Sequence, residues 1–122
     1  MLRKSVLVLA ISAGLVFASS GTALAWDSIA QKSGHGRVTL RAWTKNYNQV
    51  AFVANHKGTR VHVALTIDCR DGYHYDNTWN DGGTTFRLVR YGLGNHGRCN
   101  HTFQVVPNSS FPVISLWVYA RG

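Results

Sequence analysis

The sequence predicts an all-β protein, a small antiparallel β-sandwich held by one disulfide. Apolar and polar residues alternate with a period of two in several short runs, which is the pattern of half-buried strands. Turn-forming residues separate these runs, and no segment carries a sustained apolar stripe at helical spacing. Six or seven short strands of this kind favour a sandwich or a small barrel. An immunoglobulin-like arrangement is the first expectation, although no tryptophan stands at the spacing expected between the two cysteines.

The first element along the chain is a secretory signal peptide, expected over residues 1–25. Arg3 and Lys4 form its positive start, residues 6–18 are largely apolar, and Ala23-Leu24-Ala25 offers a small-residue cleavage site. The apolar run is shorter than the roughly 20 residues that a membrane-spanning helix needs. We therefore expect export by a bacterial-type signal, a secreted or periplasmic location, and no transmembrane segment after cleavage.

Cleavage there would leave 97 of the 122 residues, with 11 of the 13 Lys and Arg and all five Asp, so a net charge of +6. Such a basic domain attracts polyanions in a salt-dependent way. Cys69 and Cys99 are the only cysteines, and an exported chain meets an oxidising compartment in which such a pair usually closes. We expect a Cys69–Cys99 disulfide. By restricting the unfolded chain, such a bond should add roughly 3.5 kcal/mol to the free energy of unfolding.

In the mature chain, we expect residues 26–36 to form a short N-terminal arm and residues 37–122 to form one β-sandwich domain. The arm lacks a periodic pattern. The clearest strands are residues 60–69 and 113–121, in which every second residue is apolar; weaker alternations mark residues 38–43, 50–54, 85–91 and 99–106.

The segment between the central strands, residues 71–83, is the longest stretch in the middle of the domain without a strand pattern. It mixes aromatic rings with carboxylates and amides, a composition that suits sugar recognition on a loop. The EF-hand calcium pattern fails because its twelfth position holds an arginine. The alternative is a long hairpin connection whose rings pack on the sandwich. The candidate binding residues here are Tyr73, His74, Tyr75, Asp76 and Trp79.

A second candidate surface combines the outward residues of the first and last predicted strands. Arg41 and Trp43 alternate with buried positions in one, and Trp117, Tyr119 and Arg121 do so in the other. If these two strands pair, the five side chains form one basic aromatic face that could stack on sugars or bases or meet a protein. The alternative is that the rings lie against other parts of the fold.

Six histidines raise the possibility of a small hydrolase or toxin such as a nuclease. His74, flanked by Asp71 and Asp76, could act as a base, and His62 with His101 and a nearby Lys57 or Arg60 could supply metal-free acid–base chemistry. The spacings do not support either arrangement, and the sequence has no HExxH motif and no Cys/His cluster for a metal. We expect no cofactor and no metal.

The sequence therefore predicts a secreted basic binding domain rather than an enzyme, with an anionic envelope or cell-wall polymer, or a protein, as its partner. A small secreted hydrolase using His and Asp is the alternative. A subunit or inhibitor that acts only with its partner is a third possibility.

Overall fold

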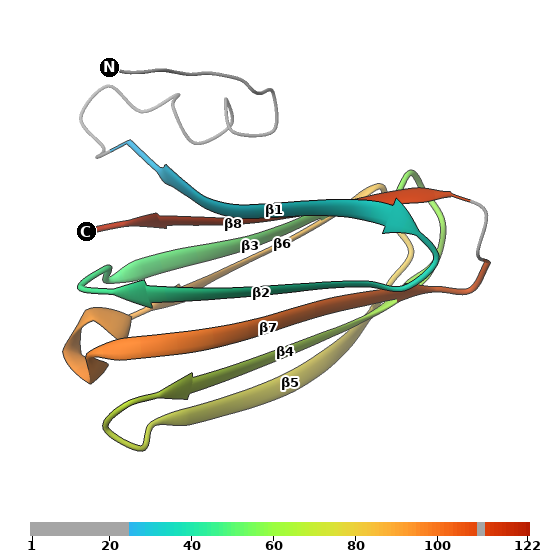
Figure 1. Ribbon diagram of the computed structural model, residues 1–122. Helices are drawn as coiled ribbons and strands as arrows, with labels where there is room; N and C mark the ends of the chain where they lie inside the picture. Colours follow the sequence, from blue (N-terminus) through green and yellow to red (C-terminus); the bar gives the residue numbers. More distant parts are fainter. Residues whose placement is uncertain (1–24, 110–111) are drawn as a thin grey trace.

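The computed structural model describes residues 25–109 and 112–122, and it forms two antiparallel four-stranded sheets packed face to face (Figure 1). The expected signal peptide lies almost entirely outside the described residues. The elements are β1 (Asp27–His35), β2 (Val38–Lys45), β3 (Gln49–Asn55), β4 (Val61–Cys69), β5 (His74–Asp81), β6 (Thr85–Tyr91), the 3-10 turn η2 (Leu93–His96), β7 (Arg98–Pro107) and β8 (Val113–Arg121).

The strand order is that of a jelly roll. Sheet A has the order β1-β8-β3-β6 and sheet B the order β2-β7-β4-β5. The neighbouring pairs are first with last, second with second-last, and so on inward, as when one long hairpin is rolled up into two sheets. The predicted antiparallel sandwich is confirmed, and its plan is a jelly roll rather than the immunoglobulin-like arrangement.

Two segments that were predicted not to be strands are edge strands. Residues 27–35, expected to be an arm, form β1 and pair with β8, with an irregularity between Ser28 and Ala30. Residues 74–81, expected to be part of a long loop, form β5 and pair with β4. Each has a neighbouring strand on one side only, so polar side chains are tolerated and no apolar alternation is required.

The core lies between the sheets and is built from the inward residues of the alternating strands. The two best-patterned segments behave as predicted, since every second residue of β4 and β8 is buried. Phe52 of sheet A meets Phe103 of sheet B edge to face, with ring centroids 5.6 Å apart. At fully buried positions, each such side chain contributes roughly 1.5–3 kcal/mol.

The predicted disulfide is present. Cys69, the last residue of β4, lies directly opposite Cys99 of β7, and their sulfurs are bonded. Immediately after it the chain turns into β5, and the Gly72 amide donates to the Cys69 carbonyl at 3.0 Å. Gly72 adopts a φ of 96°, a conformation that favours glycine. The disulfide therefore pins two central strands of sheet B at the end where the β4–β5 hairpin turns.

Candidate functional site

The candidate site is the outer face of sheet B, formed by the outward side chains of β2, β7, β4 and β5. On these strands alternate residues point into the core, so the remaining residues share one solvent-facing surface. Two adjacent rows of directly opposed residues cross all four strands. The tryptophan row is Trp43, Asn100, Asp68 and His74, and the arginine row is Arg41, Thr102, Thr66 and Asp76.

Trp43 is the exposed aromatic ring of this face. Its side chain is 54% exposed, although it lies in the middle of a regular strand. The guanidinium of Arg98 lies 4.2 Å from the ring centroid, so one side of the indole is covered by a cation. The rest of the ring remains open beside the short polar side chain of Asn100, its cross-strand partner. This arrangement presents an apolar surface next to hydrogen-bonding groups.

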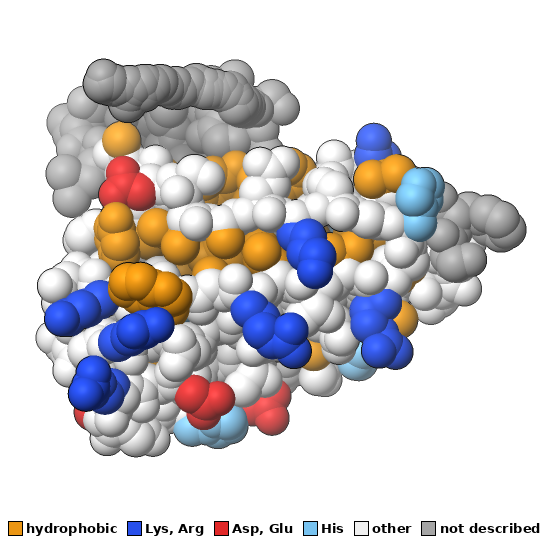
Figure 2. Space-filling view, viewed as in Figure 1, with side chains coloured by type: hydrophobic (Ala, Val, Ile, Leu, Met, Phe, Trp, Pro, Cys, Tyr) orange, Lys and Arg blue, Asp and Glu red, His pale blue; other side chains and the backbone are white. Residues whose placement is uncertain are grey.

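Charge is distributed unevenly across the face. Arg41, Lys45 and Arg98 are exposed on β2 and β7, whereas Asp68 and Asp76 are exposed on β4 and β5. Figure 2 shows acidic and histidine side chains together at the lower edge of the molecule, towards β5, with Lys and Arg side chains above them. The hydroxyls of Thr102 and Thr66 lie between the two sides in the arginine row. The face can thus offer cations, carboxylates and neutral hydrogen-bonding groups to one extended ligand.

His74 and Asp68 form an ion pair at the β5 end of the tryptophan row. The His74 Nδ1 lies 2.5 Å from an Asp68 carboxylate oxygen, and both side chains are more than half exposed. The hydrogen bond to Asp68 raises the pKa of His74 above its ordinary value, and the charge of Asp76 acts in the same direction. Both residues flank the hydroxyl-rich centre of the face, so the pair is positioned to contact a ligand lying across it.

Three aromatic residues predicted to line a binding loop do not belong to this face. Tyr75 and Trp79 are inward residues of β5, so they pack between the sheets, where Trp79 meets Phe86 with ring centroids 5.4 Å apart. The guanidinium of Arg90 lies 3.7 Å over the Tyr75 ring and donates a hydrogen bond of 3.1 Å to the Tyr73 hydroxyl. These rings close the side of the sandwich between β5 and β6.

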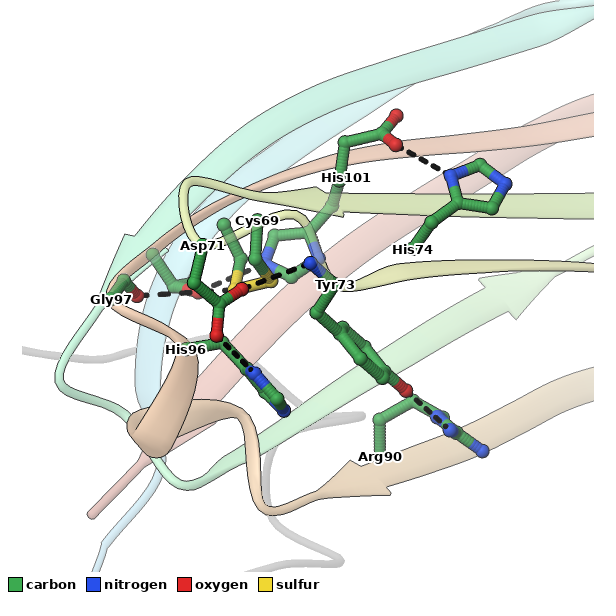
Figure 3. The surroundings of a disulfide bond; sticks show 11 residues. Cys69, Asp71, Tyr73, His74, Arg90, His96, Gly97 and His101 are labelled. Atoms are coloured by element: carbon green, nitrogen blue, oxygen red, sulfur yellow. Dashed lines mark hydrogen bonds and ion pairs between the residues drawn. A yellow bond between two sulfur atoms is a disulfide. The ribbon is translucent and has the colours of Figure 1, made fainter.

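Tyr73 also belongs to a small polar cluster that orders the β4–β5 turn, close to the disulfide (Figure 3). Its ring stacks on His96 at 4.2 Å, and its amide donates to an Asp71 carboxylate oxygen at 2.9 Å. The other Asp71 oxygen accepts from His96 Nδ1 at 2.7 Å. The hydrogen bond from the Tyr73 amide, and to a smaller extent that from His96, holds the pKa of the Asp71 carboxyl below its usual value. The cluster ties η2 to the hairpin.

The pairing of the first and last patterned strands, on which the second candidate surface depended, does not occur. β2 lies in sheet B and β8 in sheet A, where β8 pairs with β1 and β3. Trp117, Tyr119 and Arg121 therefore lie on the outer face of sheet A, on the opposite side of the sandwich from Arg41 and Trp43. Trp117 packs there beside Tyr119, which is 8% exposed. The basic aromatic surface expected from five residues is divided between two faces.

The histidine positions contradict the proposed acid–base pair. His101 points inward from β7 and is 1% exposed, whereas His62 points outward from β4 and bonds Asn80. Burial lowers the pKa of His101 to about 4, so its ring is neutral near neutral pH. His56 is also fully buried, and both of its nitrogens are occupied, by the Thr59 carbonyl and by Asp81. Neither buried ring is free to take a proton from a substrate.

His74, like His62, lies on an open surface, but the carboxylate partner of His74 is Asp68 rather than Asp71 or Asp76. Among the described residues, no group of three or more His, Cys, Asp or Glu side chains could hold a metal ion.

Several residues of the face were missed from the sequence. Asp68 and Thr66 occupy the polar positions of the β4 alternation, and Asn100 and Thr102 those of β7. The alternation identifies these residues as outward. It does not identify which strands lie side by side, and so it could not place them next to Trp43.

No protein-family model matches the sequence, and no curated protein matches it. Three solved structures are similar in fold to most of this chain, at low sequence identity. A carbohydrate-binding module, TmCBM61, solved with beta-1,4-galactotriose, is 12% identical with a TM-score of 0.46, over 75% of this chain and 69% of that one. The Yersinia pseudotuberculosis-derived mitogen is 7% identical with a TM-score of 0.47, over 80% and 86%.

A family 16 carbohydrate-binding module is 11% identical with a TM-score of 0.32, over 72% of this chain and 70% of that one. At these values the ligands of those proteins carry no argument for this chain. In the part of the chain that the structure describes, there is also no helix long and apolar enough to cross a membrane.

Proposed function

We propose that this protein is a secreted, non-enzymatic binding domain whose outer sheet B face holds an anionic polysaccharide of a cell wall or envelope. The observation that carries the proposal is the exposed Trp43 in a row of polar side chains, with Arg41, Lys45 and Arg98 around it. Single exposed apolar side chains are common on protein surfaces, so it is the combination of the open ring with the polar row and the cations that distinguishes this face.

The chemistry of the face fits a sugar chain. The open part of the Trp43 indole can cover the apolar side of a sugar ring, while Asn100 and the two threonine hydroxyls can exchange hydrogen bonds with sugar hydroxyls. Arg41 and Arg98 can donate to carboxylate, sulfate or phosphate groups, and such charge-assisted hydrogen bonds are stronger than neutral ones. Because the strands hold these groups, little order has to be gained on binding.

The basic composition supports the choice of an anionic ligand. The whole chain has a formal net charge of +8, and three of its cations surround Trp43. Export remains part of the proposal because it rests on the sequence of residues 1–25. The disulfide fits an oxidising compartment outside the cytoplasm.

The test measures binding of the protein to polygalacturonate, with dextran as an uncharged polysaccharide, by isothermal titration at low and at physiological salt. We expect binding to polygalacturonate that weakens with salt, and a loss of about tenfold in affinity for Trp43→Ala, which corresponds to roughly 1.4 kcal/mol. The matched control is Tyr91→Ala, which removes an aromatic ring that is 67% exposed on β6, away from the face. It should bind like the parent.

Equal binding by the parent and by Trp43→Ala would overturn the proposed site, because attraction by net charge alone would then explain it. Failure of the parent to bind polygalacturonate at low salt would overturn the proposed ligand class. Release of shortened sugar chains during incubation would instead favour the hydrolase hypothesis.

A further inference from the structure

The arginine row of the sheet B face carries opposite charge at its two ends, and this division is built into the strand order. Arg41 on β2 and Asp76 on β5 stand at opposite ends of one row of directly opposed residues. Three strand spacings separate them, about 14 Å between their backbones. Thr102 and Thr66 fill the middle of the row with short, uncharged side chains.

Asp76 differs from the other carboxylates of the protein. Asp68 contacts His74, Asp71 contacts His96, Asp81 contacts His56, and Asp27 accepts a hydrogen bond from Tyr47. Within the described part of the chain, Asp76 has no hydrogen bond or ion pair, and its side chain is exposed on the face. Its carboxylate is thus available to a ligand that already contacts the cations across the row.

We infer that the face recognises a zwitterionic polysaccharide, whose anionic groups lie over β2 and β7 and whose ammonium groups lie over Asp76, next to the Asp68–His74 pair. This inference rests on the proposed function and specifies its ligand. A purely anionic chain would cover the β2–β7 side well but would bring negative charge towards the carboxylate of Asp76, whereas that of Asp68 is already paired with His74. An ammonium at that position meets opposite charge instead, so the complementarity extends across all four strands.

The net charge of the protein cannot explain a preference for a ligand that carries ammonium groups. Adding ammonium groups to an anionic ligand reduces its overall attraction to a chain of net charge +8, or +6 after the expected cleavage. A preference for the zwitterionic ligand must therefore come from local carboxylates rather than from the total charge.

The experiment compares short heparin-derived oligosaccharides of one length in two forms, one with free glucosamine ammonium groups and one with the same nitrogens acetylated. Short chains are used so that multiple attachment does not obscure the single contact. At neutral pH, we expect the parent to bind the ammonium form about two- to fivefold more tightly, the size typical of exposed ion pairs. Asp76→Asn should lose this preference, and it should bind the acetylated form more tightly than the parent does, because a carboxylate facing the anionic chain is removed.

Two further variants separate the contribution of Asp76 from those of other charged residues. Asp27→Asn removes a carboxylate of sheet A and should keep the preference of the parent. Arg41→Gln should weaken binding of both forms, because it removes a cation from the anion-binding side.

Equal or tighter binding of the acetylated form by the parent would overturn this inference and leave the proposed function standing. Retention of the preference by Asp76→Asn would also overturn it. Failure of both oligosaccharides to bind, together with failure of polygalacturonate, would remove the proposed function itself.

Discussion

The buried His101 should make the stability of this protein depend on pH in acid. The ring is 1% exposed, lies edge to face against Phe52 at 5.3 Å, and has its Nε2 bonded to the Thr44 hydroxyl at 2.9 Å. Its Nδ1 is buried, without a hydrogen-bond partner in the described structure. A proton added to the ring would place an uncompensated charge in the core.

The magnitude follows from the difference between the pKa in the folded state, about 4, and the ordinary value of 6.5. Because the folded pKa is lowered, the unfolded chain takes up the proton first as the pH falls. The contribution of His101 to the free energy of unfolding is therefore complete above pH 6.5 and is lost between 6.5 and about 4. At about 1.36 kcal/mol for each unit of pKa difference, the loss is about 3 kcal/mol.

The assay is urea unfolding at a series of pH values from neutral to 4, for the parent and for the double variant Thr44→Val with His101→Phe. The double variant replaces both hydrogen-bonding partners with apolar groups of similar shape, so no buried polar atom of the pair is left without its partner. Other titrating groups affect both proteins alike, and the difference between the two pH profiles reports His101. Parallel profiles would refute the reasoning, whatever the absolute stability of the variant.

Reduction of the disulfide should lower the free energy of unfolding by roughly 3.5 kcal/mol, measured by urea unfolding with and without reductant. Gly72→Ala should lower the free energy of unfolding by about 1 kcal/mol because Gly72 has a positive φ, although an added methyl group would meet no atom within 4 Å. Gly83→Ala, at a position without a positive φ, should lower it less. An NMR titration should place the midpoint of His74 above 6.5 in the parent and lower in Asp68→Asn; an unchanged midpoint would contradict the ion pair. The proton held by this pair stabilises the fold below pH 6.5, and that stabilisation is lost as the pH rises through the raised pKa.

Local patterning was sufficient where one face of a strand is buried. The alternation of residues 60–69 and 113–121 correctly identified two central strands, because burial of every second side chain leaves a direct record in the sequence. The partnership of Cys69 with Cys99 was also predictable, since the chain contains no other cysteine.

Two of the four edge strands, β1 and β5, escaped prediction because their polar residues hide the alternation, whereas the edge strands β2 and β6 were predicted from it. β1 and β5 each form backbone hydrogen bonds with a single neighbouring strand, and these bonds place few demands on side-chain polarity. Because β5 is rich in polar and turn-forming residues, its sequence resembles that of a loop. Its inward rings, Tyr75 and Trp79, consequently became candidates for a ligand surface when they pack inside the sandwich.

The sequence by itself determined the class of the fold, the disulfide, the basic charge and the outward direction of Arg41 and Trp43, whereas His74 was expected in a loop. Only the tertiary structure decided which outward residues share a surface. Trp43 and His74 lie in one row because β7 and β4 stand between their strands in a fixed register, whereas Trp117 is directed to the other side of the molecule. Alternation records whether a side chain is buried, but strand neighbours are chosen by long-range pairing and core packing, which no local pattern contains.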